Sequence, residues 1–297
     1  MADLGFDGKV AIITGAGGGL GRSHALELAK RGALIVVNDL GGAVDGTGGS
    51  DTAAQKVVDE IKALGGEAVA NYDSVATPEG GANIVKTAVD AFGTVHVIIN
   101  NAGILRDTSF KNMTPDQLNP VLDVHLRGAF YVTQPAWQMM RDQNYGRVIN
   151  TSSGAGVFGN FGQTNYGAAK MGLVGLTRVL AVEGAKNNIK VNAIAPVAKT
   201  RMTEELLGPV ADGLAPEFVT PVVTYLAHET CEVTGEVYSV GGGRVARVFI
   251  GVTPGYTNKE LTPEDVAEHL AQIRAEEGYE VPANLNEEMM LTLKALS

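Results

Sequence analysis

The sequence predicts a doubly wound α/β fold, in which a parallel sheet of about seven strands carries helices on both faces. Short, β-branched apolar runs alternate with helical segments along most of the chain. Parallel strands need crossover connections, usually helices, so this alternation favours a parallel sheet. The expected strands are residues 10–13, 34–37, 68–70, 95–99, 148–150, 191–194 and 237–240. The expected helices are residues 20–31, 51–64, 80–92, 115–142, 165–187 and 215–228.

We expect the 297 residues to form a single domain, because no linker, repeat or low-complexity tract divides them. The alternation ends at three glycines, which predicts a core of residues 1–243 and a C-terminal extension of residues 244–297. In the extension, Thr262 precedes a proline and two acidic residues, the pattern of a capped helix start, and the helix should run to about Glu277. The extension is expected to pack on its own core or on a partner subunit.

Composition excludes several classes of protein. The formal net charge of −10 argues against a surface for nucleic acid or anionic membranes. The single cysteine, Cys231, excludes an internal disulfide and fits a reducing compartment. Neither a signal peptide, nor an apolar run of about 18–20 residues, nor a Ser-Lys-Leu address is visible. We therefore expect a cytoplasmic protein without a membrane span, and we expect no metal site.

A glycine-rich turn follows the first expected strand and opens the first expected helix. Its spacing is Thr14-Gly15-x-x-x-Gly19-Leu20-Gly21, which differs from the G-x-G-x-x-G of the standard dinucleotide fingerprint. Glycines in such a turn let the backbone approach a pyrophosphate, and the helix N-terminus supplies N–H donors. The order of strand, turn and helix therefore predicts a Rossmann-type nucleotide site that uses Gly15, Gly19, Leu20 and Gly21.

Asp39 indicates which dinucleotide this site would bind. It follows the second expected strand, about twenty residues beyond the glycines. A carboxylate there can accept hydrogen bonds from ribose hydroxyls and would repel a 2′-phosphate. No Arg or Lys lies between Asp39 and Asp51 to offset the charge. NAD is therefore the expected cofactor rather than NADP.

Tyr166 and Lys170 form the chemically most informative pair in the chain. A phenol has a pKa of about 10 and is a poor base near neutrality. A lysine four residues later on a helix shares its face, and its charge would favour the phenolate. Ser153, just past the fifth expected strand, could orient a substrate oxygen beside them. These residues predict a catalytic Ser153, Tyr166 and Lys170, with Ser153 and Tyr166 contacting the substrate.

Other polar motifs also follow strand ends, where open α/β sheets bind their ligands. They are Asp73, the run Asn100-Asn101-Ala102-Gly103, and Pro196. Together with Asp39 and Ser153, they predict one site along the carboxyl edge of the sheet.

These motifs resemble the short-chain dehydrogenase/reductase superfamily over about residues 1–243. Its glycine motif matches residues 14–21, its Asn-Asn-Ala-Gly motif residues 100–103, and its catalytic triad Ser153, Tyr166 and Lys170. Residues 38–42, 70–75, 103–107, 125–128 and 159–163 are more closely similar to the (3R)-hydroxyacyl-CoA dehydrogenase part of peroxisomal multifunctional enzyme type 2. The extension, residues 244–297, is similar to that subgroup too.

The resemblance assigns roles to further residues. It implies that Asp73, Ser74 and Val75 contact adenine, that Asn101 and Gly103 shape the cofactor pocket, and that Thr200 contacts the carboxamide. His125 stands where most superfamily members have a relay Asn, so a proton relay through His125 is a hypothesis beside a core-packing role. The usual Pro-Gly before the substrate loop is Pro196-Val197 here, and the expected substrate loop is residues 201–214.

The function implied is NAD-dependent interconversion of a secondary alcohol and a ketone, most closely (3R)-3-hydroxyacyl-CoA and 3-oxoacyl-CoA. Three alternatives stay open. They are a 17β-hydroxysteroid or sterol side-chain acyl-CoA dehydrogenase, a 3-oxoacyl reductase, and a non-catalytic NAD-binding protein. The superfamily usually pairs subunits through the two long helices that correspond to residues 115–142 and 165–187. A homodimer or homotetramer is therefore expected.

Overall fold

The computed structural model describes residues 4–200 and 213–296. The chain divides into two compact units, Met1–Arg247 and Val248–Ser297. The first unit contains the sheet and its helices, and the second contains three short helices.

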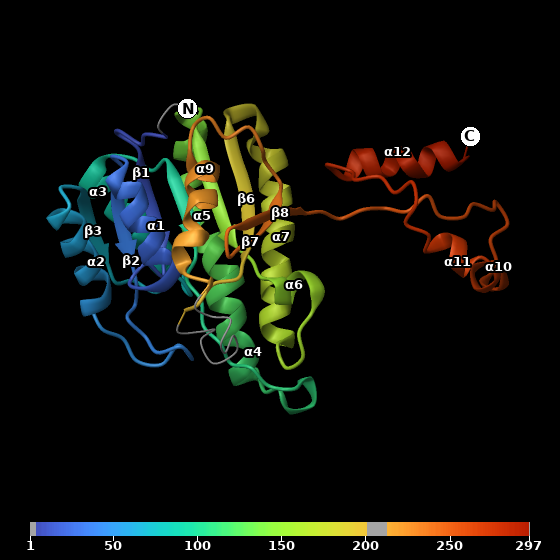
Figure 1. Ribbon diagram of the computed structural model, residues 1–297, viewed down its shortest axis with the longest axis horizontal. Coiled ribbons are helices and arrows are strands. Elements are labelled where there is room, and N and C mark those ends of the chain that lie inside the picture. Colours follow the sequence, from blue (N-terminus) through green and yellow to red (C-terminus); the bar gives the residue numbers. More distant parts are fainter. Residues whose placement is uncertain (1–3, 201–212, 297) are drawn as a thin grey trace. The chain divides into compact units, whose positions relative to one another are not determined.

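The sheet of the first unit is doubly wound, as predicted (Figure 1). Its strand order is β3-β2-β1-β4-β5-β6-β7-β8, and the strands from β3 to β7 in this order pair in parallel. The order reverses between β1 and β4, which is where such folds open a crevice for ligands. The strands are β1 (Val10–Thr14), β2 (Leu34–Asn38), β3 (Glu67–Asn71), β4 (Val97–Asn100), β5 (Gly146–Thr151), β6 (Ile189–Pro196), β7 (Val237–Gly241) and β8 (Arg244–Val248).

The eighth strand differs from the prediction, which placed residue 244 at the start of the extension. β7 and β8 are joined by Gly242 and Gly243, whose φ angles are 55° and 79°. Two consecutive residues with positive φ form the type I′ turn of a tight hairpin. The glycines that end the alternating pattern are therefore a hairpin turn, and the sheet continues through Arg244–Val248.

Helices cover both faces of the sheet (Figure 1). A separate apolar cluster is buried on each face. Ala11 and Ile13 of β1 join the cluster of α1, α2 and α9, whereas Val10 and Ile12 join that of α3 and α5. This alternation follows from the two-residue period of a strand. The helices named so far are α1 (Gly19–Lys30), α2 (Thr52–Ala63), α3 (Pro78–Phe92), α5 (Gly128–Asp142) and α9 (Thr220–Ala227).

The helix predicted over 115–142 is interrupted. It consists of α4 (Pro115–Leu122), one π-helical turn (Asp123–Arg127) and α5. Pro120 lies inside α4, where it has no N–H to donate to the carbonyl four residues earlier, that of Asp116. The π turn brings His125 inward, so the interruption helps to shape the site. Two further helices flank that site, α6 (Gly154–Phe158) and α7 (Thr164–Gly184).

The second unit contains α10 (Pro263–Glu268), α11 (Leu270–Ile273) and α12 (Leu285–Leu296). Thr262 and Asp265 form a capping box, as the sequence predicted for this helix start. The predicted helix to about Glu277 is broken at His269, whose φ and ψ of −96° and 12° end α10. No side chain between 248 and 294 is buried. Within the described ranges of the whole chain, no helix is long and apolar enough to cross a membrane.

Candidate active site

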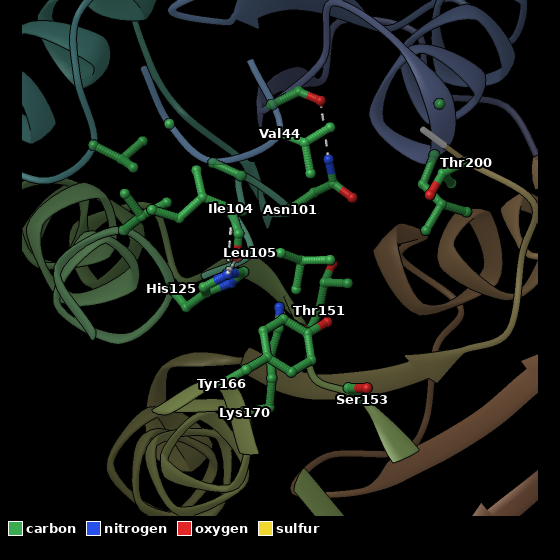
Figure 2. A pocket seen from close by; sticks show the side chains of 18 of the residues that line it. Val44, Asn101, Ile104, Leu105, His125, Thr151, Ser153, Tyr166, Lys170 and Thr200 are labelled. Carbon is green, nitrogen blue, oxygen red and sulfur yellow. Dashed lines mark hydrogen bonds between the residues drawn. The ribbon is translucent and has the colours of Figure 1, made fainter. Parts of the chain in front are cut away.

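A cavity of about 740 Å³ runs along the carboxyl edge of the sheet. It is lined by every residue predicted for the site except Gly21, and Figure 2 shows the catalytic part of it. The predicted residues that line it are Gly15, Gly19, Leu20, Asp39, Asp73, Ser74, Val75, Asn101, Gly103, His125, Ser153, Tyr166, Lys170, Pro196 and Thr200. The expected substrate loop falls mainly on residues 201–212, which lie outside the described residues.

The glycine-rich turn is tightly packed at Gly21 and open to the cavity at Gly18. A Cβ on Gly21 would lie 2.4 Å from the carbonyl oxygen of Gly15, so Gly21 packs beneath the turn rather than lining the cavity. Gly18 is the N-cap residue of α1, and no side chain among the described residues accepts a hydrogen bond there. No described atom lies within 4 Å of a Cβ added to Gly18. The first N–H groups of α1 are therefore available to an anionic ligand.

Asn101 holds this turn against the end of β4. Its side-chain amide donates to the carbonyl oxygens of Thr14 and Gly15, both at 3.0 Å. The hydroxyl of Thr14 in turn accepts the backbone N–H groups of Asn101 and Ala102. A Cβ on Gly15 would lie 2.7 Å from Cα of Ala102, which is why this position requires glycine. Asn101 thus shapes the cavity by fixing two loops to each other.

Asp39 lies at the end of β2 with both carboxylate oxygens turned to backbone donors. Oδ2 accepts the N–H of Gly17 at 2.7 Å, and Oδ1 accepts the N–H of Gly41 at 2.7 Å. These bonds fix the carboxylate on the cavity wall, beside the glycine turn. A carboxylate oxygen can accept more than one hydrogen bond, so the group can still bind ligand hydroxyls.

Asp73 marks the far end of the cavity, past β3. Its backbone N–H donates to Asn71 Oδ1, and its carboxylate accepts from the amide groups of Asn71 and Asn83. Ser74 and Val75 follow it on the wall, and Val75 is buried. This end therefore presents a fixed polar edge beside an apolar side chain, which suits a planar base.

Ser153, Tyr166 and Lys170 come together where β5 ends and α6 and α7 begin (Figure 2). Ser153 caps α6, and its Oγ accepts the N–H of Ala155 at 3.2 Å. Lys170 Nζ lies 5.4 Å from the centroid of the Tyr166 ring and donates to the carbonyl oxygen of Thr151. The three side chains thus share one corner of the cavity.

Burial controls the protonation of this corner. It raises the pKa of Tyr166, and a hydrogen bond with Ser153 opposes the increase. It also lowers the pKa of Lys170 from 10.5 to about 7. We expected the lysine to lower the pKa of the phenol, but a buried lysine that is only partly charged near neutrality does so weakly. Additional positive charge beside the phenol would be needed to favour the phenolate.

His125 is buried and neutral. Burial, followed by the charge of Lys170, lowers its pKa well below 6.5. Its Nε2 lies 3.1 Å from the N of Ile104 and 2.8 Å from its carbonyl oxygen, and its ring packs edge-on against Tyr166 at 5.1 Å. Within the described structure, His125 Nδ1 has no hydrogen-bond partner. His125 therefore positions the Ile104 backbone and the Tyr166 ring, while its relay role stays a prediction.

The sequence analysis gave two groups of lining residues no role in the site. Gln163, which is buried, donates to Asp107 Oδ2 at 2.6 Å and accepts from Asn160 at 2.9 Å. The charge of Asp107 also contributes to the raised pKa of Tyr166. The other group comprises Leu40, Gly42, Ala43, Val44, Gly46, Ile104 and Leu105. Their sequence signals were the family resemblance of residues 38–42, 103–107 and 159–163 and their nearness to the predicted site residues. Neither signal assigns a role, because both groups depend on loop contacts.

Comparison with known proteins identifies the family. The model for short chain dehydrogenase matches residues 9–208. The chain belongs to the short-chain dehydrogenase family. A short-chain type dehydrogenase/reductase of Mycobacterium tuberculosis is 55% identical over 271 residues, which are 91% of this chain and 95% of that protein.

Peroxisomal multifunctional enzymes are also close relatives. Peroxisomal multifunctional enzyme A of Dictyostelium discoideum is 50% identical over 99% of this chain, which spans 66% of that enzyme. The structure of full-length peroxisomal multifunctional enzyme type 2 from Drosophila melanogaster matches with a TM-score of 0.83 at 38% identity. That match covers 99% of this chain and 50% of the other. A 7α-hydroxysteroid dehydrogenase complexed with NADH and a 7-oxo bile acid matches with a TM-score of 0.74 at 28% identity, over 82% of this chain and 98% of that one.

The chain is therefore a short-chain dehydrogenase/reductase enzyme, and enzymes of this family use NAD or NADP. The cavity fits such a cofactor, since the uncapped α1 N-terminus, the open edge at Gly18 and the Asp39 carboxylate lie along one wall. No group of three or more His, Cys, Asp or Glu residues suited to a metal ion occurs among residues 4–200 and 213–296.

Proposed function

We propose that this enzyme is an NAD-dependent dehydrogenase that interconverts (3R)-3-hydroxyacyl-CoA and 3-oxoacyl-CoA. The observation that carries the proposal is the corner of Ser153, Tyr166 and Lys170 in the same cavity as Asp39. The similarity to peroxisomal multifunctional enzymes over 99% of the chain supports the acyl-CoA substrate class.

The choice of NAD rests on Asp39. Its carboxylate lies on the cavity wall and is held by Gly17 and Gly41. The carboxylate would repel the 2′-phosphate on the ribose of NADP, whereas the ribose hydroxyls of NAD could donate hydrogen bonds to it. The same argument disfavours an NADPH-linked 3-oxoacyl reductase.

In alcohol oxidation, Tyr166 accepts the hydroxyl proton of the substrate at its phenol oxygen. Ser153 donates to that substrate oxygen and holds it against Tyr166 while charge develops on it. Bound NAD supplies the hydride acceptor and a positive ring that favours the phenolate. The carbonyl of Thr151 holds the Nζ of Lys170 over the Tyr166 ring, where this group can donate a hydrogen bond. His125 holds the ring edge and the Ile104 backbone, which keeps the phenol aimed into the cavity.

The test is the initial rate with NAD and with NADP on (3R)-3-hydroxyacyl-CoA thioesters and on their (3S) epimers. We expect NAD-linked turnover of the (3R) series, with inert epimers. Turnover of neither series, or a preference for NADP, would contradict the proposal.

A hydroxysteroid dehydrogenase is the second candidate, since a solved hydroxysteroid dehydrogenase superposes with a TM-score of 0.74. A 17β-hydroxysteroid belongs in the same rate assay. Turnover of the steroid alone would keep the role of Tyr166 and replace the substrate.

We also propose a cytoplasmic homodimer or homotetramer. Exposed apolar side chains on α5 and α7 support the assembly: Phe130, Met171, Val179 and Val182. Sedimentation at several protein concentrations would test it, and a monomer at all of them would contradict it.

A further inference from the structure

The loop of residues 40–50, which we term the strap, is a closed and internally bonded segment. The N–H of Ser50 donates to the carbonyl of Leu40 at 3.0 Å, which pinches its two ends together. Inside it, the N–H of Ala43 donates to Thr47, and Asp45 accepts both the N–H and the hydroxyl of Thr47. A compact surface loop of this length whose ends lie close together is an Ω-loop, a class that is frequently functional.

The strap begins directly after Asp39 and forms part of the cavity wall. Leu40, Gly42, Ala43, Val44 and Gly46 all line the cavity. The carboxylate that would bind the ribose hydroxyls is itself tied to the strap, through the N–H of Gly41. A bound dinucleotide at Asp39 would therefore lie against the strap.

The tip of the strap is docked on residues 104–106. The N–H of Leu105 donates to Val44 at 2.9 Å, and Nε of Arg106 donates to the carbonyl of Asp45 at 2.9 Å. Gly46 packs so closely on Ile104 that an added Cβ would lie 3.1 Å from two of its carbon atoms. These three contacts close the wall beside the cofactor site.

Arg106 also anchors this junction to α4. Its Nη1 donates at 2.6 Å to the carbonyl of Asp116. That carbonyl has no helical donor four residues later, because the residue there is Pro120. One guanidinium thus joins the strap tip to α4 through two backbone carbonyls, and both bonds are charge-assisted.

We propose that the strap retains the bound dinucleotide and that Arg106 is the positioning residue that keeps the strap docked. Release of the cofactor then requires the tip to leave residues 104–106. This inference rests on cofactor binding at Asp39 and is independent of which alcohol the enzyme oxidises.

The test is the dissociation rate of NADH from the full-length protein, measured by stopped flow. The protein is loaded with NADH and mixed with excess NAD, and the loss of bound-NADH fluorescence is followed. We expect Arg106→Ala to accelerate dissociation about tenfold, which corresponds to about 1.4 kcal/mol. The KM for NAD should rise, while kcat at saturating NAD should not fall. Lys111, an exposed residue that follows Arg106 in the same loop region, is the control. Lys111→Ala should leave the rate of NADH dissociation unchanged.

A matched pair of glycines isolates the docking contact. Gly46 and Gly48 have similar positive φ angles of 84° and 70°, but only Gly46 faces a neighbour; among the described atoms nothing lies within 4 Å of a Cβ at Gly48. Both alanine variants carry the same backbone strain. We expect Gly46→Ala to accelerate NADH dissociation several-fold and Gly48→Ala to leave it within twofold of wild type.

Rates within twofold of wild type in both Arg106→Ala and Gly46→Ala would overturn the proposal. Equal acceleration by Gly46→Ala and Gly48→Ala would overturn it as well, because strain rather than docking would be the cause. If Arg106→Ala does not fold, as judged by its melting transition, the glycine pair decides. If the acyl-CoA proposal fails, NADH dissociation stays measurable, so the two failures are distinguishable.

Discussion

Tyr166 is the residue on which the proposed chemistry depends most directly. Replacing it with Phe removes the proton acceptor but keeps the ring that packs against His125. General base catalysis contributes typically about 10²–10⁴-fold, so we expect Tyr166→Phe to lose at least about 10² in kcat. NADH binding, measured by fluorescence, should stay within a few-fold. Tyr225→Phe on α9 is the control, and near-normal turnover by Tyr166→Phe would refute the role of the phenol.

We propose that Asp39 selects NAD over NADP. Its carboxylate accepts hydrogen bonds from two backbone N–H groups and would also accept them from the ligand. An Asn at this position has a single acceptor oxygen and no charge. Asp39→Asn should therefore lower the ratio of kcat/KM for NAD to that for NADP by about tenfold or more, a change of about 1.4 kcal/mol. Asp51→Asn, at an exposed carboxylate just beyond the strap, makes the same change of charge and should not alter the ratio. An unchanged ratio in Asp39→Asn would place selectivity elsewhere.

At the residue scale, the sequence predicted side chains that follow strand ends, because the topology of a parallel sheet collects them at one edge. Gly21 was assigned to the cofactor by its motif, yet steric packing against Gly15 places it behind the turn. The contact of Gln163 with Asp107 was not predicted, since it depends on Thr108 pairing with Gly162 between two loops. Such pairing leaves no periodic signal in the sequence.

At the element scale, α3 and α5 cross closely enough for a single glycine to test their packing. A Cβ on Gly81 would lie 2.2 Å from the backbone oxygen of Tyr131. Overpacking costs about 1–3 kcal/mol or more, which exceeds the gain of about 1 kcal/mol in helix propensity. We expect Gly81→Ala to lower the free energy of unfolding in urea by about 2 kcal/mol.

The neighbouring residue gives the matched control for that crossing. Ala82 is exposed on the same helix, so Ala82→Gly should cost only about 1 kcal/mol, through propensity alone. Greater stability of Gly81→Ala than of wild type would show that the helices can separate at no cost.

The helices and strands were predictable where one hydrophobic period ran through the whole element. The prediction failed where local residues interrupted that period. The parallel strands from β1 to β7 and helices α1, α2 and α3 were expected within a few residues. Pro120 and the π turn after it broke the long helix, and that break could not be read from the apolar pattern alone. The β7–β8 hairpin was missed because its glycines could equally end a domain.

At the scale of the whole molecule, the sheet order explains how distant segments form one site. The strands β1, β4 and β5 are neighbours, although residues 14, 101 and 153 are far apart in the sequence. The strap and residues 104–106 are hydrogen-bonded to each other in the wall of the cavity. They thereby join the cofactor end of the cavity to its catalytic end.

The whole molecule should also lose stability as the pH falls below 6.5, because two histidines are buried in the neutral form. Burial lowers the pKa of His24 from 6.5 to about 3, and that of His125 well below 6.5. Between pH 6.5 and 3 the unfolded chain therefore binds more protons than the folded one, so stability is lost as pH falls through this window. Each such histidine contributes a slope of at most about 1.4 kcal/mol per pH unit.

His24 is the histidine to substitute, since it lies on α1, away from the catalytic corner, and contacts Thr220 Oγ1 through Nδ1 at 2.8 Å. We expect His24→Leu to make the dependence of unfolding free energy on pH shallower between pH 6.5 and 5, above the range in which most carboxylates titrate. Ser23→Ala is the control, because Ser23 also contacts Thr220 but does not titrate in this window. It should shift the whole curve without changing its slope. An equal slope in His24→Leu and wild type, from urea titrations at each pH, would mean that His24 is protonated in the folded protein.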